Sequence, residues 1–178
     1  MAAREVKVGD KVRAISSDGG EPVCTDVYYA FHHPEASARA VTIEVQDEEG
    51  DIDTFQVSDN HLVYVGERFE DRVTVLAKHV KPGDVLISSK ASGGTKVLSV
   101  ESSVSDLVNI LTFEPHLELK GGHVVSAYSY HQYLYPALFF PFRVIYTLFG
   151  AASFDYVKPT VDVIDTWIAQ PLVGLAYE

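Results

Sequence analysis

The chain has 178 residues, 47% of them hydrophobic and 22% charged, which is typical of one globular domain with room for a small appendage. Its net charge is −11 and no cluster of Lys or Arg is present, which argues against a nucleic-acid partner because phosphate binding needs a basic surface. The single cysteine, Cys24, excludes an internal disulfide framework and a cysteine-based zinc site.

The first predicted strands surround an acidic turn. Apolar and polar side chains alternate over residues 41–46, which is the period of a half-buried strand. Residues 47–51, Asp-Glu-Glu-Gly-Asp, predict a hairpin turn, and residues 52–57 predict the returning strand. The apolar run at 62–65 is typical of a strand buried on both faces. We therefore expect a hairpin followed by a core strand.

Further short strands are predicted over residues 97–100, 107–112 and 124–128, separated by Gly- and Ser-rich breaks. No window before residue 130 keeps the 3.6-residue period of a helix. Many short strands with regular turns indicate a closed or folded-over β architecture.

The composition changes at residues 133–150, which are almost wholly apolar and aromatic. Two prolines and Arg143 argue against a transmembrane helix. We expect a short helix over 142–148 with Pro141 at its start, and a second over 161–169. The first helix either caps the β core or presents a lipid-facing patch, and the sequence leaves both open.

One stretch of sequence occurs twice. The first copy begins Val-Lys-Val-Gly-Asp at residue 6, and the second begins Val-Lys-Pro-Gly-Asp at residue 80. Each continues through Ile-Ser-Ser to Gly-Gly and a β-branched run. Two copies are too few for a solenoid, so a two-fold duplication inside one β domain fits better.

Ser58 and His61 are the first candidate catalytic residues. They lie three positions apart in Ser-Asp-Asn-His, between two predicted strands, where a turn can direct both side chains to one point. This pairing suits acyl chemistry, in which the hydroxyl hydrogen-bonds a strained peptide and the imidazole protonates the departing amine. The same pattern also occurs in purely structural turns, so the residues alone leave the role open.

A second polar site is predicted at His32 and His33, which follow the strand predicted over residues 26–31. A solvated turn is the alternative. Metal binding by these two histidines and His61 lacks the helix spacing or the cysteines of common zinc sites, so we predict no metal and no cofactor.

Five segments carry a family resemblance: REVKVGDKV at 4–12, SDNHLV at 58–63, AKHVKPGDV at 77–85, GHVVSAY at 122–128, and His131 with FFPFRV at 139–144. In this order they resemble the Hint (Hedgehog/intein) domain, specifically the C-terminal autoprocessing domain of Hedgehog-type proteins. The second segment resembles the family's Thr-x-x-His block, with Ser58 in place of threonine.

The resemblance implies an all-β, pseudo-two-fold Hint fold with a short helical C-terminal appendage. It implies a Hint-like β domain over residues 1–130 and a hydrophobic, partly helical extension over 131–178. The implied function is self-cleaving or self-splicing autoprocessing. A cysteine makes an N-to-S acyl shift, and the upstream polypeptide is then transferred to a nucleophile. In this scheme His61 and Ser58 support the first step, and His32 supports the second.

Three positions depart from the family pattern. No Cys, Ser or Thr precedes Ser16, so the family's nucleophilic cysteine falls before Met1, and we expect the chain as given not to cleave itself. Cys24 lies inside a predicted strand and is a poor substitute. His32 stands where animal Hedgehogs have the aspartate that activates sterol, so water or another small nucleophile stays open beside sterol. Ala127 replaces a second thiol.

Three functions therefore remain open: an autoprocessing domain, a degenerate Hint fold that no longer cuts, and a β module that binds lipid or protein through residues 133–150. In the first, the substrate is the polypeptide fused ahead of the chain, and the activity is a single-turnover, cysteine-type self-cleavage. A Hedgehog-like precursor would also imply a secreted or membrane-associated protein.

Overall fold

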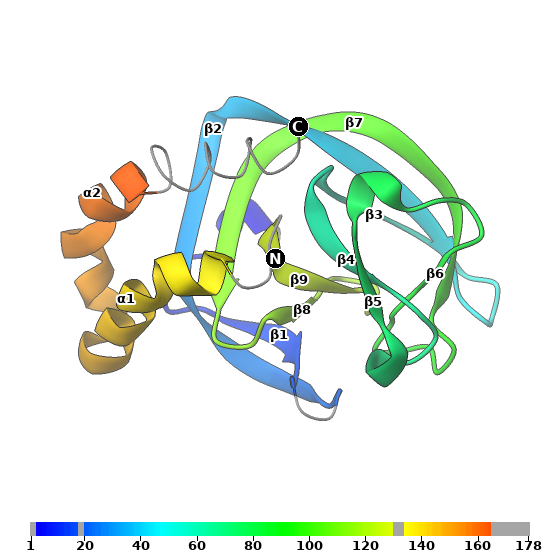
Figure 1. Ribbon diagram of the computed structural model, residues 1–178, viewed down its shortest axis with the longest axis horizontal. Helices are drawn as coiled ribbons and strands as arrows, with labels where there is room; N and C mark the ends of the chain where they lie inside the picture. The colour runs from blue at the N-terminus through cyan, green and yellow to red at the C-terminus, as the bar shows by residue number, and fades with distance from the viewer. Residues whose placement is uncertain (1–2, 18–19, 130–133, 165–178) are drawn as a thin grey trace.

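The computed structural model describes residues 3–17, 20–129 and 134–164 (Figure 1). Strands come first along the chain and α-helices last, with short 3₁₀ helices (η) between them. The elements are η1 (Ala3–Glu5), β1 (Lys11–Ile15), β2 (Pro22–Gln46), β3 (Ile52–Ser58), β4 (His61–Val65), η2 (Phe69–Asp71), β5 (Val73–Leu76), η3 (Ala77–His79), β6 (Val85–Leu86), β7 (Thr95–Thr112), β8 (His116–Glu118), β9 (Val124–Ser129), α1 (Leu134–Phe149), η4 (Ala151–Ser153) and α2 (Phe154–Ile164).

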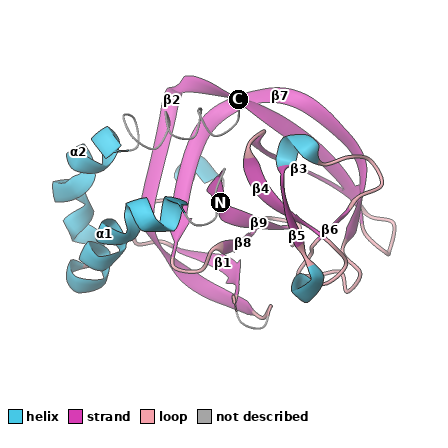
Figure 2. Cartoon of the chain, in the orientation of Figure 1, coloured by secondary structure: helices cyan, strands magenta, loops and turns pink. Residues whose placement is uncertain are grey.

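The described strands form one sheet that closes on itself. Its order is β1-β8-β9-β4-β6-β7-β2-β3, with β5 added to β4, and β1 also pairs with β2. The two α-helices lie together at one end of this sheet (Figure 2). The predicted fold class, all-β with a short helical end, is confirmed.

Two strands are much longer than the sequence predicted. The segments 97–100 and 107–112 belong to the single 18-residue strand β7, and β2, with 25 residues, continues through His32 and His33. The two strands pair antiparallel along most of their length, with register shifts at three points. They arch together across the molecule in Figure 1. The ladder keeps the serines of residues 102–105 extended, although we interpreted this segment as a break between two strands.

The sequence duplication corresponds to duplicated structure. In the first copy the Lys7 amide donates to the Asp10 carboxylate at 2.8 Å, and in the second the Lys81 amide donates to Asp84 at 2.8 Å. The glycine amides of the two turns donate equivalently, Gly9 to the Val27 carbonyl and Gly83 to the Val97 carbonyl, both at 2.9 Å. A 3₁₀ turn precedes each copy, at η1 and η3. The prediction of a duplication is therefore confirmed at these turns.

The helical end differs from the prediction in where its helices begin. Helix α1 starts at Leu134 and contains Pro141 in its interior, and α2 starts at Phe154, seven residues before the predicted 161. Residues 165–169 of the predicted second helix lie outside the described residues. Burial explains the longer α1, because Phe139 and Phe142 pack against Tyr28 and Tyr29 of β2. Within the described residues, no helix is both long enough and apolar enough to cross a bilayer.

Candidate functional site

His61 and Ser58 are placed on either side of a tight turn. Ser58 ends β3 and His61 begins β4, with Asp59 and Asn60 between them. Two hydrogen bonds join this turn to neighbouring segments. The Asp59 amide donates to the Arg39 carbonyl at 3.0 Å, and Lys78 Nζ donates to Asn60 Oδ1 at 2.8 Å. Both candidate residues therefore sit on a rigid connection, and both line one cavity.

The ring of His61 is oriented by a backbone carbonyl. Its Nε2 lies 2.7 Å from the carbonyl oxygen of Ser126 in β9. Because a carbonyl oxygen only accepts, Nε2 carries the proton in the neutral ring and Nδ1 is the basic atom. Burial lowers the pKa of His61 below its usual value, and the hydrogen bond to Ser126 acts in the opposite direction. The imidazole is therefore neutral at pH 7, as a general base must be before it takes a proton.

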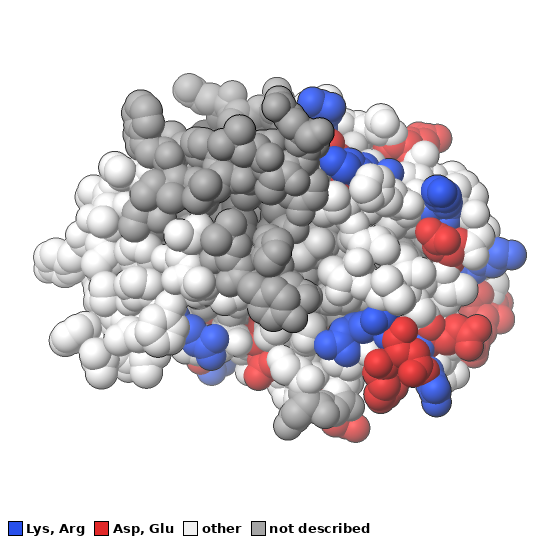
Figure 3. All heavy atoms as spheres, in the orientation of Figure 1, with Lys and Arg blue, Asp and Glu red and all other residues white. Residues whose placement is uncertain are grey.

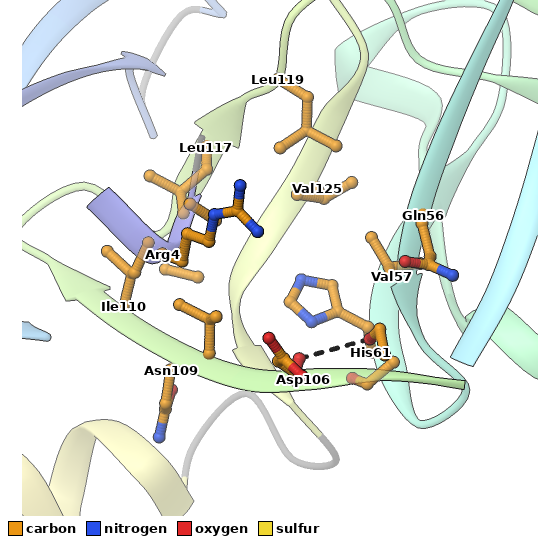
Figure 4. Close-up of a pocket in the computed structure, with 15 residues that line it drawn as sticks. Arg4, Gln56, Val57, His61, Asp106, Asn109, Ile110, Leu117, Leu119 and Val125 are labelled. Atoms are coloured by element: carbon orange, nitrogen blue, oxygen red, sulfur yellow. Dashed lines mark hydrogen bonds between the residues drawn. The ribbon is translucent and has the colours of Figure 1, made fainter. Parts of the chain in front are cut away.

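The cavity has a volume of about 350 Å³ and is lined by four parts of the chain (Figure 4). Most of its wall is apolar, and Ser58, His61 and Asp106 are among its polar residues. The lining residues are Ala3 and Arg4 of η1, Gln56, Val57 and Ser58 of β3, His61 of β4, Ser105, Asp106, Val108, Asn109 and Ile110 of β7, and Leu117, Leu119, Val125 and Ala127 of β8, β9 and the loop between them. Ala3 and Arg4, the first two described residues, therefore form part of this wall.

Asp106 connects this cavity to the third predicted residue, His32. The Asp106 side chain lines the cavity, and its Oδ2 lies 3.5 Å from Nε2 of His32. His32 itself is not among the residues that line the cavity, and it is paired with Val108 across the β2–β7 ladder. The structure therefore brings Ser58 and His61 together directly, and it brings His32 to the same site only through Asp106.

Asp106 was missed in the sequence analysis. It is the only acidic residue in the segment 102–113, which could have drawn attention to it. Its position next to His32 depends on a register shift between His33 and Ser37 in β2, which no local pattern reveals.

Two further features concern the position of Cys24 and the arrangement of residues that could bind a metal ion. Cys24 is exposed on β2, opposite Arg13 of β1, and is not among the residues lining the cavity. Among the described residues, no group of three or more His, Cys, Asp or Glu is arranged to hold a metal ion.

Comparison with known proteins agrees with this fold. Residues 1–112 match the Hint module family. The structure resembles an intein from a hyperthermophile, with a TM-score of 0.53, 18% identity and coverage of 65% of this chain and 70% of that one. A bacterial intein-like domain from Clostridium thermocellum gives a TM-score of 0.54, 18% identity and coverage of 71% and 86%. A DnaB intein from Synechocystis sp. PCC 6803 gives a TM-score of 0.57, 10% identity and coverage of 72% of this chain and 86% of that one.

No curated protein matches the chain. The family match covers more than half of the 178 residues, and the intein structures share the closed β fold. The chain therefore belongs to the Hint family, whose fold is that of autoprocessing-type domains.

Proposed function

We propose that the chain is the processing part of a self-cleaving precursor, and that it transfers the polypeptide joined ahead of it to a nucleophile. The observation that carries this proposal is the shared cavity, where His61, Ser58 and Asp106 meet the start of the described chain at Ala3 and Arg4. Acyl transfer needs an acid–base group and a hydrogen-bonding group beside one peptide, and this cavity holds both.

In the first step a cysteine thiol of the joined segment attacks the carbonyl carbon of the peptide bond before it. The thiol proton passes to Nδ1 of His61 and from there to the departing amine, while the C–N bond breaks and a thioester forms. Ser58 donates a hydrogen bond to the strained peptide. The neutral state of His61 favours this role, because the ring must first accept the proton.

In the second step water or a hydroxyl compound attacks the thioester. His32 takes the proton of this nucleophile as its oxygen bonds to the acyl carbon. The C–S bond then breaks, and the departing sulfur takes up the proton, so that the acyl group is transferred to the new oxygen. The carboxylate Oδ2 of Asp106 lies 3.5 Å from Nε2 of His32, close enough to form an ion pair once His32 has taken this proton. Sterol belongs to this class of acceptor, as do smaller alcohols and water.

The test is a fusion of a reporter domain, a cysteine-started segment and this chain, followed by gel electrophoresis with and without added thiol. His61→Ala should slow thioester formation by roughly 10²- to 10⁴-fold. Ser58→Ala should slow it only about five-fold, since one hydrogen bond is worth about 1 kcal/mol. Asp106→Asn should leave the first step intact and slow the second, so that thioester accumulates. Added thiol then cleaves this thioester, which makes it visible on the gel.

His79→Ala is the matched control, because His79 is exposed on η3, outside the cavity, and its loss should change neither step. Cleavage of the His61→Ala fusion at the parent rate would contradict the proposal.

A degenerate Hint fold that binds lipid or protein is the second candidate. Helices α1 and α2 expose Phe140, Leu148, Phe149 and Tyr156, each at least 60% accessible. On the face drawn in Figure 3, this end of the molecule shows few charged atoms, whereas charges are dense at the opposite end. An apolar surface with few charged residues fits a neutral bilayer or an apolar partner. Liposome binding by a chain whose cysteine-led fusion never cleaves would favour this candidate.

A further inference from the structure

The pairing of β4 with β9 is irregular where it holds His61. His61 is opposite Ser129, and Val63 is opposite Val125, so two steps along β4 correspond to four along β9. Residues 126–128 therefore form a bulge opposite Leu62. A bulge turns backbone groups away from the regular ladder and can direct them at a neighbouring side chain. Here the Ser126 carbonyl accepts from the His61 ring at 2.7 Å.

Two contacts within the protein fix the shape of this bulge. The amide of Tyr128 donates to Oγ of Ser126 at 3.0 Å, and the amide of Ala127 donates to the Pro115 carbonyl at 2.6 Å. Ser126 is only 2% exposed, so water cannot easily replace its hydroxyl as the acceptor for the Tyr128 amide. The side chain and the carbonyl of one serine thus act on opposite sides of the strand.

On the side away from His61, Ser126 lies beside the buried residues Tyr64 and His116. Tyr64 and Ser126 line one pocket on this side, and the hydroxyl of Tyr64 lies 2.8 Å from Nδ1 of His116. Tyr64 is 4% exposed and His116 is 7% exposed. Tyr64 and His116 line this pocket together with Ser126, and neither of them lines the cavity that His61 lines.

We propose that Ser126 is a positioning residue for His61: its hydroxyl locks the bulge, and the locked carbonyl keeps the proton of the neutral imidazole on Nε2. Nδ1 is thereby kept as the basic nitrogen of the ring. The inference rests on the proposed role of His61, but the tautomer that it concerns can be measured without any cleavage.

The test is ¹⁵N NMR of the histidine rings in the whole 178-residue chain, above the pKa of His61, with the His61 signals assigned from a His61→Gln spectrum. We expect the Nε2–H tautomer to dominate in the parent. Ser126→Ala should lower the ratio of Nε2–H to Nδ1–H by about five-fold, which corresponds to about 1 kcal/mol. Ser126→Thr keeps the hydroxyl and should retain the parent ratio.

Two further variants serve as a control and as a second test. Ser102→Ala removes an exposed hydroxyl of β7 and should leave the tautomer unchanged. Tyr64→Phe keeps Ser126 but removes the buried hydroxyl beside it, and it should shift the ratio in the same direction by a smaller amount. This variant decides the matter if Ser126→Ala does not fold.

The outcomes separate the two proposals. An unchanged tautomer ratio in folded Ser126→Ala, or in Tyr64→Phe if the former is unfolded, overturns the positioning role whether or not the fusion cleaves. A shifted ratio in a domain whose cleavage is insensitive to His61→Ala supports the positioning of the ring and overturns its catalytic role.

Discussion

The buried histidines show how one residue type acquires different roles from its surroundings. The ring of His116 is enclosed by Tyr64 and Phe69, with centroid distances of 5.2 and 4.9 Å. Burial, assisted by the nearby positive charge of Arg72, lowers the pKa of His116 to about 4. His116 therefore stays neutral at pH 7 and serves as a hydrogen-bonding partner of Tyr64 rather than as a charge.

This shift predicts a loss of stability on acidification. In the unfolded chain His116 takes up a proton near pH 6.5, whereas the folded chain resists protonation down to about pH 4. The unfolded state thus binds more protons in this window, so the free energy of unfolding falls as the pH is lowered through it. The contribution is full above pH 6.5 and falls by up to about 1.4 kcal/mol per pH unit.

His116→Asn is the variant to measure, because its amide nitrogen can take the place of Nδ1 but cannot titrate. We expect urea unfolding of this variant to depend less on pH between 6.5 and 4 than that of the parent. His79→Ala, at an exposed position, should keep the parent's dependence. Equal slopes in His116→Asn and the parent would show that His116 is protonated alike in both states.

At the scale of elements, local chemistry made some parts of the fold predictable and tertiary pairing hid others. The hairpin at 47–51 forms where Asp-Glu-Glu-Gly-Asp predicted it, because Asp47 accepts the Asp51 amide through its own side chain and Gly50 supplies a φ of +91°. The strand β4 follows from its apolar run. These signals act within a few residues and can be read from the sequence.

The missed features depend on distant residues. β7 is one strand because β2 supplies a hydrogen-bonding partner through its serine-rich middle. Proline normally ends a helix, yet α1 continues through Pro141 because burial of aromatic side chains on both sides of it outweighs one lost backbone hydrogen bond. In the candidate site, Ser58 and His61 could be proposed from their spacing, whereas Asp106 could not, since only the register of β2 and β7 brings it to His32.

Two adjacent residues of α1 test what this helix contributes. Phe139 is fully buried with its ring 5.0 Å from that of Tyr29, and Phe140 is 60% exposed. Phe139→Ala should lower the free energy of unfolding by about 3–5 kcal/mol, as for other buried aromatic residues. Phe140→Ala should change it by less than about 0.5 kcal/mol. Urea unfolding measures both.

The same pair separates a structural cap from a lipid-binding helix. If α1 also contacts lipid, Phe140→Ala should weaken binding to neutral phosphatidylcholine liposomes at unchanged stability. If α1 is only a cap, neither the parent nor Phe140→Ala binds these liposomes. A Phe139→Ala variant as stable as the parent would contradict the packing of α1 on the β core.

At the scale of the whole molecule, the duplication gives two turns with the same backbone and different surroundings. Gly9 and Gly83 have φ values of +92° and +95°, a region that other residues rarely adopt. A Cβ atom at Gly83 would have no other atom within 4 Å, whereas one at Gly9 would lie 2.9 Å from Cβ of Ala151 in η4. The helical end is thus packed against the first copy of the turn, and the second copy is open.

This difference predicts unequal costs for one substitution made in both copies. Gly83→Ala should lower the free energy of unfolding by about 1–3 kcal/mol through backbone strain alone. Gly9→Ala should cost about 1–3 kcal/mol more, because it also forces two carbon atoms together. In an Ala151→Gly background that extra cost should disappear, and a double-mutant cycle by urea unfolding measures it as a coupling energy. Equal costs at the two glycines, with no coupling to Ala151, would mean that η4 does not rest on the first turn in solution.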